Sequence, residues 1–385
     1  MNLFQRVVER FFTPHRPLPA GIYQYQAPPD SKNIYRIHLR LEPSGEGVAI
    51  INARTVLHLN QTAAEFIYHI INQTPQEEIV RQVSRRYRAS REDIQKDLQN
   101  LQERLEILVT TPDLDPVTYL DFERREPYSG EFSAPYRLDC ALTYQVVAGE
   151  HAHLAPLERV ARELLTEEWK TILQKAWQAG IPHVIFTGGE PTLRNDLIDL
   201  VAFSEQLGMV SGLLTSGVRL TEKEYLHRLL QSGLDHLMLL LDPSEDQSWE
   251  ALRDVLGEDI FTTVHLTLTS ENKDEMTGLI GKLAEMGVRS LSLSTSDPGL
   301  KDELQAASHT AADRGISLMW DLPVPYSTFH PVALELQEAG QPVSGAGKAW
   351  LYVEPDGDVL PAQGVNQLLG NLLSDPWEKI WKLRE

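Results

Sequence analysis

The sequence predicts an α/β protein: a partial, TIM-like (βα)6 barrel, preceded by a small α+β winged-helix-like domain and followed by a short hairpin extension. Two observations predict this fold. From residue 136 onward, apolar strands alternate with amphipathic helices, which is typical of parallel βα units. Before them, three short strands are followed by three helices between residues 33 and 110, which indicates a separate small domain.

The composition limits the class of protein. The chain has 385 residues, one cysteine and a net charge of −20. The acidic charge argues against general nucleic-acid binding, which needs a basic surface. One cysteine excludes an internal disulfide and an all-cysteine metal site within one chain. No apolar run reaches the roughly 20 residues that a membrane span needs, so we expect a cytoplasmic protein.

The first 32 residues are expected to form an amphipathic helix over residues 3–12 and then a proline-rich linker. Phe4, Val8 and Phe11 share one face of this helix, and charged residues lie elsewhere. We favour packing of that face on the protein's own body. Docking of residues 1–12 on a partner or at a membrane surface is the alternative.

The small domain is expected over residues 33–110, with strands at 35–41, 48–51 and 56–59. One helix begins near Thr62. A second begins at Thr74-Pro75, and a third begins at Ser90, whose side chain is a good N-cap.

This domain resembles the pyrroloquinoline-quinone D-type domain, the recognition element of ribosomally made peptide systems, in the runs 35–41, 51–53 and 57–65. The resemblance implies that a leader or precursor peptide adds as a strand beside residues 56–59 and packs against the third helix. Strand addition suits an edge strand with unpaired N–H and C=O groups. The expected peptide-binding residues are Val56, Leu57, His58, Leu59, Leu98, Leu101 and Leu105. A domain that serves only as a spacer is the alternative.

After a second linker at residues 111–135, the barrel is expected over residues 136–325. Its strands are predicted at 136–143, 183–186, 212–215, 236–241, 263–268 and 290–293. Its helices are predicted at 166–179, 196–207, 222–231, 247–255, 275–286 and 302–313. Functional loops are expected after the strands, at their C-terminal ends.

The loop after the second of these strands reads Gly188-Gly189-Glu190-Pro191. Two glycines allow backbone to approach a ligand closely. In this position the loop resembles the GGEP loop of radical S-adenosylmethionine (SAM) proteins. Leu241-Asp242, after a later strand, matches the Leu-Asp pattern of the same family. The resemblance implies a SAM site at Gly188, Gly189, Glu190 and Ser216, in which the loop and its glutamate hold the amino group of SAM.

The C-terminal extension, residues 326–385, contains a predicted hairpin around Pro355-Asp356-Gly357. With the Leu369–Leu372 run that follows, it resembles the SPASM extension of radical SAM peptide maturases.

The chain departs from this family where the family has cysteines. The [4Fe–4S] ligand positions after the first barrel strand align with Val146, Glu150 and His153, or in another register with Cys140, Tyr144 and Val147. The SPASM cysteine positions align with Ser344, Tyr352 and Ala362. Iron–sulfur clusters need thiolate ligands. We therefore expect no cluster, no cofactor beyond weak SAM binding, and a buried, unreactive Cys140.

These departures predict a non-catalytic protein that binds a peptide and acts as a scaffold or accessory subunit, paired with an active radical SAM protein or a larger complex. One alternative is a repurposed metalloenzyme that binds zinc or iron through Glu150 and His153. A solvated loop is the simpler interpretation of those residues. Another alternative is a structural subunit docked through residues 1–12.

Overall fold

The structure is a computed structural model, and it describes residues 18–28, 30–33, 35–52, 55–111, 133–146, 157–295, 297–319 and 345–381. The chain divides into two compact units, Met1–Ser129 and Gly130–Glu385. Each unit has its own buried apolar core.

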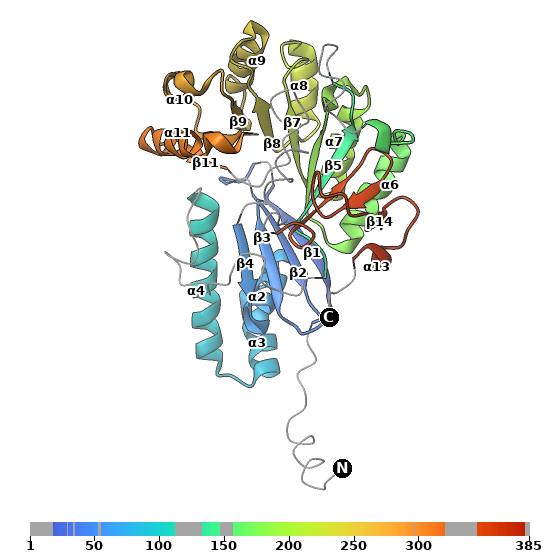
Figure 1. Ribbon diagram of the computed structural model, residues 1–385. Helices are drawn as coiled ribbons and strands as arrows, with labels where there is room; N and C mark the ends of the chain where they lie inside the picture. The colour runs from blue at the N-terminus through green and yellow to red at the C-terminus, as the bar shows by residue number, and fades with distance from the viewer. Residues whose placement is uncertain are drawn as a thin grey trace. The chain divides into compact units, whose positions relative to one another are not determined.

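The first unit contains a four-stranded antiparallel sheet in the order β1-β2-β3-β4, followed by three helices (Figure 1, blue to cyan). Its strands are β1 (Gly21–Gln26), β2 (Arg36–Leu41), β3 (Gly47–Ile51) and β4 (Thr55–Leu59). Its helices are α2 (Gln61–Ile71), α3 (Gln76–Tyr87) and α4 (Arg91–Thr110). Three of the strands and all three helices agree with the elements that the sequence predicts.

Period-two alternation and side-chain caps explain these elements. Ile37, Leu39 and Leu41 alternate along β2 and are buried in the core that the helices complete. Helix α2 begins after Asn60, whose Oδ1 accepts a hydrogen bond from the backbone N–H of Ala63 at 2.9 Å. Ser90 caps α4 in the same way, with Oγ 3.1 Å from the backbone nitrogen of Asp93.

Strand β1 corrects the prediction of a proline-rich linker over residues 13–32. It pairs with β2 along its whole length, from Gly21 opposite Leu41 to Gln26 opposite Arg36. Tyr23 and Tyr25 pack against the core of the unit. The prolines on either side of this run suggested a linker, but none lies within it, and an edge strand tolerates flanking prolines.

The second unit is built on parallel strands with helices between them. The strands are β5 (Arg137–Thr143), β6 (His183–Gly188), β7 (Val210–Thr215), β8 (His236–Leu240), β9 (Phe261–Leu268), β10 (Ser290–Thr295) and the short β11 (Ser317–Leu318). The helices are α6 (Thr166–Ala179), α7 (Leu197–Leu207), α8 (Lys223–Gln231), α9 (Asp246–Leu256), α10 (Met276–Glu285) and α11 (Lys301–Asp313). The predicted alternation from β5 to α11 is confirmed.

The C-terminal hairpin consists of β12 (Trp350–Val353) and β13 (Asp358–Leu360), and is followed by β14 (Gly370–Asn371) and α13 (Trp377–Ile380). The hairpin was predicted, but its attachment was not. Strand β12 pairs in parallel with β5, so the sheet runs in the order β11-β10-β9-β8-β7-β6-β5-β12-β13-β14 (Figure 1). This pairing brings the hairpin beside the first strand of the parallel sheet.

The two faces of the parallel sheet differ. On β5, Leu138, Cys140 and Leu142 belong to the main core, which also contains Trp169 of α6. Ala141 belongs instead to a small cluster with Tyr352 and other residues on the opposite face. Within the described part of the chain, no helix is long and apolar enough to cross a membrane.

Candidate cofactor site and peptide-binding edge

The two glycines after β6 allow the loop to lie directly against the backbone that follows β5. The N–H of Gly189 donates to the carbonyl of Thr143 at 2.8 Å, and the N–H of Glu190 donates to the carbonyl of Gln145 at 2.7 Å. A Cβ atom on Gly188 or on Gly189 would lie 2.2 Å from one of these carbonyl oxygens. Gly188 also has φ of +126°, which disfavours any side chain. Both positions therefore require glycine.

Glu190 is the centre of the site. Its side chain is 2% exposed, and its carboxylate accepts five hydrogen bonds. Oε1 accepts from the backbone nitrogen of Thr192 at 3.0 Å, from Oγ1 of Thr192 at 2.5 Å and from Oγ1 of Thr215 at 2.6 Å. Oε2 accepts from the backbone nitrogen of Ser216 at 2.8 Å and from Oγ of Ser216 at 2.5 Å. The carboxylate thus ties the loop after β6 to the end of β7.

The structure brings the predicted cofactor residues Gly188, Gly189, Glu190 and Ser216 together at the C-terminal ends of β6 and β7. The sequence interpretation did not include Thr192 and Thr215. A signal for both exists, because a threonine two residues after a glutamate, or at the end of the next strand, can reach that carboxylate.

A buried polar cluster occupies the end of β5. The hydroxyl of Tyr144 donates to Oε1 of Glu354 at 2.9 Å, and Nη2 of Arg159 donates to the same oxygen at 2.6 Å. The hydroxyl groups of Tyr144 and Tyr352 are 3.5 Å apart, and both rings are buried. Side chains from the segment after β5 and from the C-terminal hairpin therefore meet beside the end of β5.

Cys140, which one of the two registers places at a cluster-ligand position, is the one cysteine among the described residues at these positions. Val146 is half-buried, Tyr352 and Ala362 are buried, and Glu150, His153 and Ser344 lie outside the part of the chain that the structure describes. In that part, no group of three or more histidine, cysteine or acidic residues is arranged to hold a metal ion.

Cys140 is fully buried on the helix-covered face of β5, as predicted. Burial, and secondarily the neighbouring Asp139 carboxyl, raises the pKa of this thiol well above its usual value. A [4Fe–4S] cluster needs several thiolates. The described residues of this chain therefore do not fit a [4Fe–4S] cluster, whereas Glu190 fits a ligand that carries an amino group.

Three histidines and a set of hydroxyls line the face of the sheet opposite the main core. His265 of β9 lies with Nδ1 3.0 Å from Oγ of Ser292 and Nε2 3.0 Å from Oγ of Ser294, both on β10. Nε2 of His183 and Nε2 of His236 are 2.8 Å apart. The sequence interpretation passed over these residues, although the alternating Ser-Leu-Ser-Leu-Ser run at 290–294 indicated a polar face on β10.

The predicted peptide-binding residues of the first unit divide into two groups. Strand β4 is the last strand of its sheet, and the side chains of Val56 and His58 are half-buried on it. The other predicted residues are buried together in the core of the unit, where they pack against one another: Leu57, Leu59, Leu98, Leu101 and Leu105. The leucines thus position β4 against the helices.

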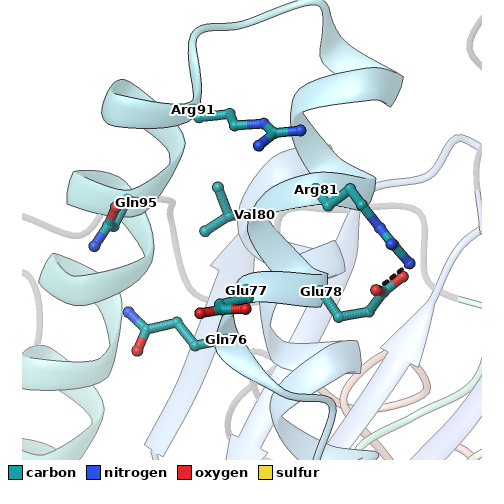
Figure 2. Close-up of a pocket in the computed structure, with 7 residues that line it drawn as sticks. All are labelled: Gln76, Glu77, Glu78, Val80, Arg81, Arg91 and Gln95. Atoms are coloured by element: carbon teal, nitrogen blue, oxygen red, sulfur yellow. Dashed lines mark ion pairs between the residues drawn. The ribbon is translucent and has the colours of Figure 1, made fainter.

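A polar pocket of about 540 Å³ lies between α3 and α4, lined by Gln76, Glu77, Glu78, Val80, Arg81, Arg91 and Gln95. In Figure 2 an ion pair joins Glu78 and Arg81 on one side of the pocket, and Val80 lies between the two helices. Both signs of charge line this pocket, so it selects neither an acidic nor a basic ligand.

These features define a class of protein: a parallel α/β protein whose candidate site lies at the C-terminal ends of its strands, with an added antiparallel domain. Residues 140–265 match the family described as the radical SAM superfamily, and residues 47–106 match coenzyme PQQ synthesis protein D. The PqqA peptide cyclase of Streptomyces rochei is 32% identical over 256 residues, which cover 59% of this chain and 70% of that protein. The chain belongs to the radical SAM superfamily.

Other similar proteins agree with this assignment. The PqqA peptide cyclase of Rhizobium meliloti (strain 1021) is 26% identical, over 58% of this chain and 67% of that protein. The crystal structure of Streptococcus suis SuiB bound to its precursor peptide SuiA has a TM-score of 0.59 at 16% identity, covering 90% of this chain and 87% of SuiB. The SuiB structure bound to SAM has a TM-score of 0.56 at 17% identity, covering 93% and 88%. At this identity the two structures establish the fold.

These findings correct two expectations. The expectation of a non-catalytic scaffold or accessory subunit is wrong, because the chain belongs with proteins named as peptide cyclases. The expectation of no cofactor is wrong as well, because the family to which the chain belongs uses SAM and [4Fe–4S] clusters. The cysteine count shows only whether this one chain supplies its own cluster ligands. It does not by itself decide whether the protein is an enzyme.

Proposed function

We propose that this protein is a peptide-modifying radical SAM enzyme that binds a precursor peptide along β4 and holds the amino group of SAM at Glu190. The observation that carries the proposal is the combination, in one chain, of a PqqD-type domain with an edge strand and a parallel sheet with a carboxylate at its C-terminal end. The relative named PqqA peptide cyclase supports a peptide substrate of the same kind.

The finer architecture is part of the proposal. We propose that residues 33–110 act as the peptide-recognition domain, that the parallel sheet is a partial TIM-like barrel, and that residues 326–385 form a SPASM-like extension. Glu190, with Ser216 beside it, would hold SAM, whose sulfonium-linked adenosyl group supplies the family's chemistry when it is bound. The backbone contacts of Gly188 and Gly189 keep Glu190 at the strand ends.

The peptide would bind by strand addition. Along an antiparallel edge strand, successive residues direct their N–H and C=O groups alternately to the neighbouring strand and to the open edge. Thr55 and Val56 are adjacent, and both are half-buried on β4. One of them therefore points its N–H toward the open edge and the other toward β3.

The experiment is a titration of fluorescently labelled PqqA peptide with the full-length protein, followed by anisotropy. Thr55→Pro and Val56→Pro each remove one N–H. We expect the variant that loses the edge-facing N–H to keep its melting temperature and to bind the peptide at least about tenfold more weakly. Equal peptide affinity in every variant that remains folded would contradict binding along β4.

Modification is tested separately. Incubation of the peptide with the protein, SAM and a reductant, followed by mass spectrometry, should give a change in peptide mass that depends on SAM. Peptide binding without any mass change would contradict the enzymatic half of the proposal and leave the binding half standing.

A further inference from the structure

The carboxylate of Glu190 has no spare acceptor capacity in this structure. Two carboxylate oxygens offer about four lone-pair directions, and here they accept five hydrogen bonds. A carboxylate can only accept, so any ligand that binds it must supply a donor, and an amino group is the strongest such partner. That ligand must first replace one of the present donors.

The five donors differ in how readily a ligand can displace them from the Glu190 carboxylate. The side chains of Thr192 and Thr215 are fully buried, and both hydroxyls serve Oε1. The two backbone N–H groups are fixed by the chain. Ser216 is half-buried, so it is the one partly exposed residue among the three whose side chains donate to the carboxylate. Rotation about a single side-chain bond can release it from Oε2.

We propose that Ser216 controls the affinity and selectivity of the Glu190 site for SAM: the amino group of SAM takes the place of the Ser216 hydroxyl on Oε2. The backbone N–H of Ser216 stays on the same oxygen and, with Thr215, keeps the carboxylate oriented. Ser216 is thus a specificity-determining residue, which competes with the ligand that the site selects. This inference rests on the proposed function, because it takes SAM as the ligand of Glu190.

The test compares SAM with 5′-methylthioadenosine, which shares the adenosine and the sulfur but lacks the amino-acid group. Each compound is titrated calorimetrically into full-length wild-type protein, Ser216→Ala and Thr192→Val. Ser216→Ala frees Oε2 without the cost of releasing a hydroxyl. We expect it to bind SAM about fivefold more tightly than the wild type, the equivalent of one neutral hydrogen bond. Its affinity for methylthioadenosine should equal that of the wild type.

Thr192→Val is the matched control, because it removes a hydroxyl from the buried oxygen Oε1. We expect no gain in SAM affinity from it. Ser216→Gly removes the same hydroxyl and keeps the backbone donor, so it replaces Ser216→Ala if that variant has a lowered melting temperature.

Three results would overturn the inference. If SAM binds the wild type but binds Ser216→Ala equally or more weakly, Ser216 does not compete, and SAM binding itself stands. If Ser216→Ala tightens both compounds equally, the effect is not specific for the amino group. If neither protein binds SAM, the proposed SAM site at Glu190 fails, and the inference fails with it.

Discussion

At the scale of single residues, the positions that tolerate no substitution are those where two backbone segments lie in close contact. Gly188 and Gly189 lie against the carbonyls of Thr143 and Gln145, and no side chain fits there without moving the backbone of β5. Glu190 depends on this approach, because its own N–H donates to Gln145. The glycines hold together the loops that follow β5 and β6, and the Glu190 carboxylate adds the loop that follows β7.

Gly188→Ala should therefore destabilise the protein by about 2 kcal/mol or more, because a Cβ would overlap a carbonyl oxygen at positive φ. Urea unfolding measures the loss. Gly278→Ala is the control. It lies in α10 with nothing within 4 Å of the added Cβ, and it should gain about 0.5–1 kcal/mol from the lower backbone entropy of alanine. Equal effects of the two changes would refute this account of the loop.

His236 makes stability depend on pH. Burial, and secondarily the nearby Arg137, lowers the pKa of its imidazole to about 4, against about 6.5 in an unfolded chain. Between these values the unfolded chain binds more protons. The contribution of His236 is thus complete above pH 6.5 and is lost as the pH falls toward 4, at up to about 1.4 kcal/mol per pH unit.

His236→Gln should flatten the fall in unfolding free energy between pH 6.5 and pH 4.5, since glutamine does not take up the proton. Urea denaturation at several pH values measures this slope. His227→Gln, on the exposed face of α8, should leave the slope as it is in the wild type. A slope that does not change in His236→Gln would show that other groups cause the acid sensitivity.

At the scale of elements, a strand pairing and a lysine side chain both help to fasten the C-terminal extension to the parallel sheet. Strand β12 pairs with β5, and Lys175 of α6 reaches the turn that follows β14. Its ammonium donates to the backbone carbonyls of Leu372 at 2.7 Å, Leu373 at 3.0 Å and Asp375 at 3.0 Å. One ammonium group thus bonds three backbone carbonyls of the turn that follows β14.

Lys175→Met keeps the length of the side chain and removes these three bonds. We expect a loss of about 1.5–3 kcal/mol, the usual size for hydrogen bonds to a charged group, together with faster amide exchange around β14. Lys170→Met on the same helix removes a surface ion pair with Glu167 and a contact of the ammonium with the Phe203 ring, and should cost less than about 1 kcal/mol. If both variants behave alike, Lys175 does not fasten the extension.

At the scale of the whole molecule, the chain contains two units that each bury a separate core. The first unit has a complete sheet, three helices and capped helix ends within Met1–Ser129. Such a unit has what an independently folding domain needs.

Residues 1–129 expressed alone should therefore fold, with a single cooperative thermal transition and dispersed amide resonances. Under the proposed function, the isolated domain and the full-length protein should bind the test peptide equally tightly, because β4 lies within the domain. A fragment that is unfolded, or folded but unable to bind a peptide that the whole protein binds, would contradict an autonomous recognition domain.

The sequence by itself determined the local architecture. Period-two runs and caps such as Ser90 predicted β2 to β4 and the helices, and the alternation after residue 136 predicted β5 to α11. The Gly188-Gly189-Glu190 run marked the candidate cofactor site, whose binding of SAM stays a prediction. These features are local, because they depend on neighbours within a few residues along the chain. Strand β1 was missed because the prolines on either side of it suggested a linker, and its short alternation becomes a strand only by pairing with β2.

Only the tertiary structure decided which distant groups meet. It joined β12 to β5, brought Tyr144 and Arg159 to Glu354, and gave Glu190 its donors from Thr192, Thr215 and Ser216. Sequence spacing cannot fix such contacts, because they depend on strand order and register across the sheet. The missing cysteines were visible in the sequence, but the conclusion drawn from them was not sound. The sequence shows which residues occupy the cluster-ligand positions. Whether the protein is catalytic depends on the folded protein and on the family to which it belongs.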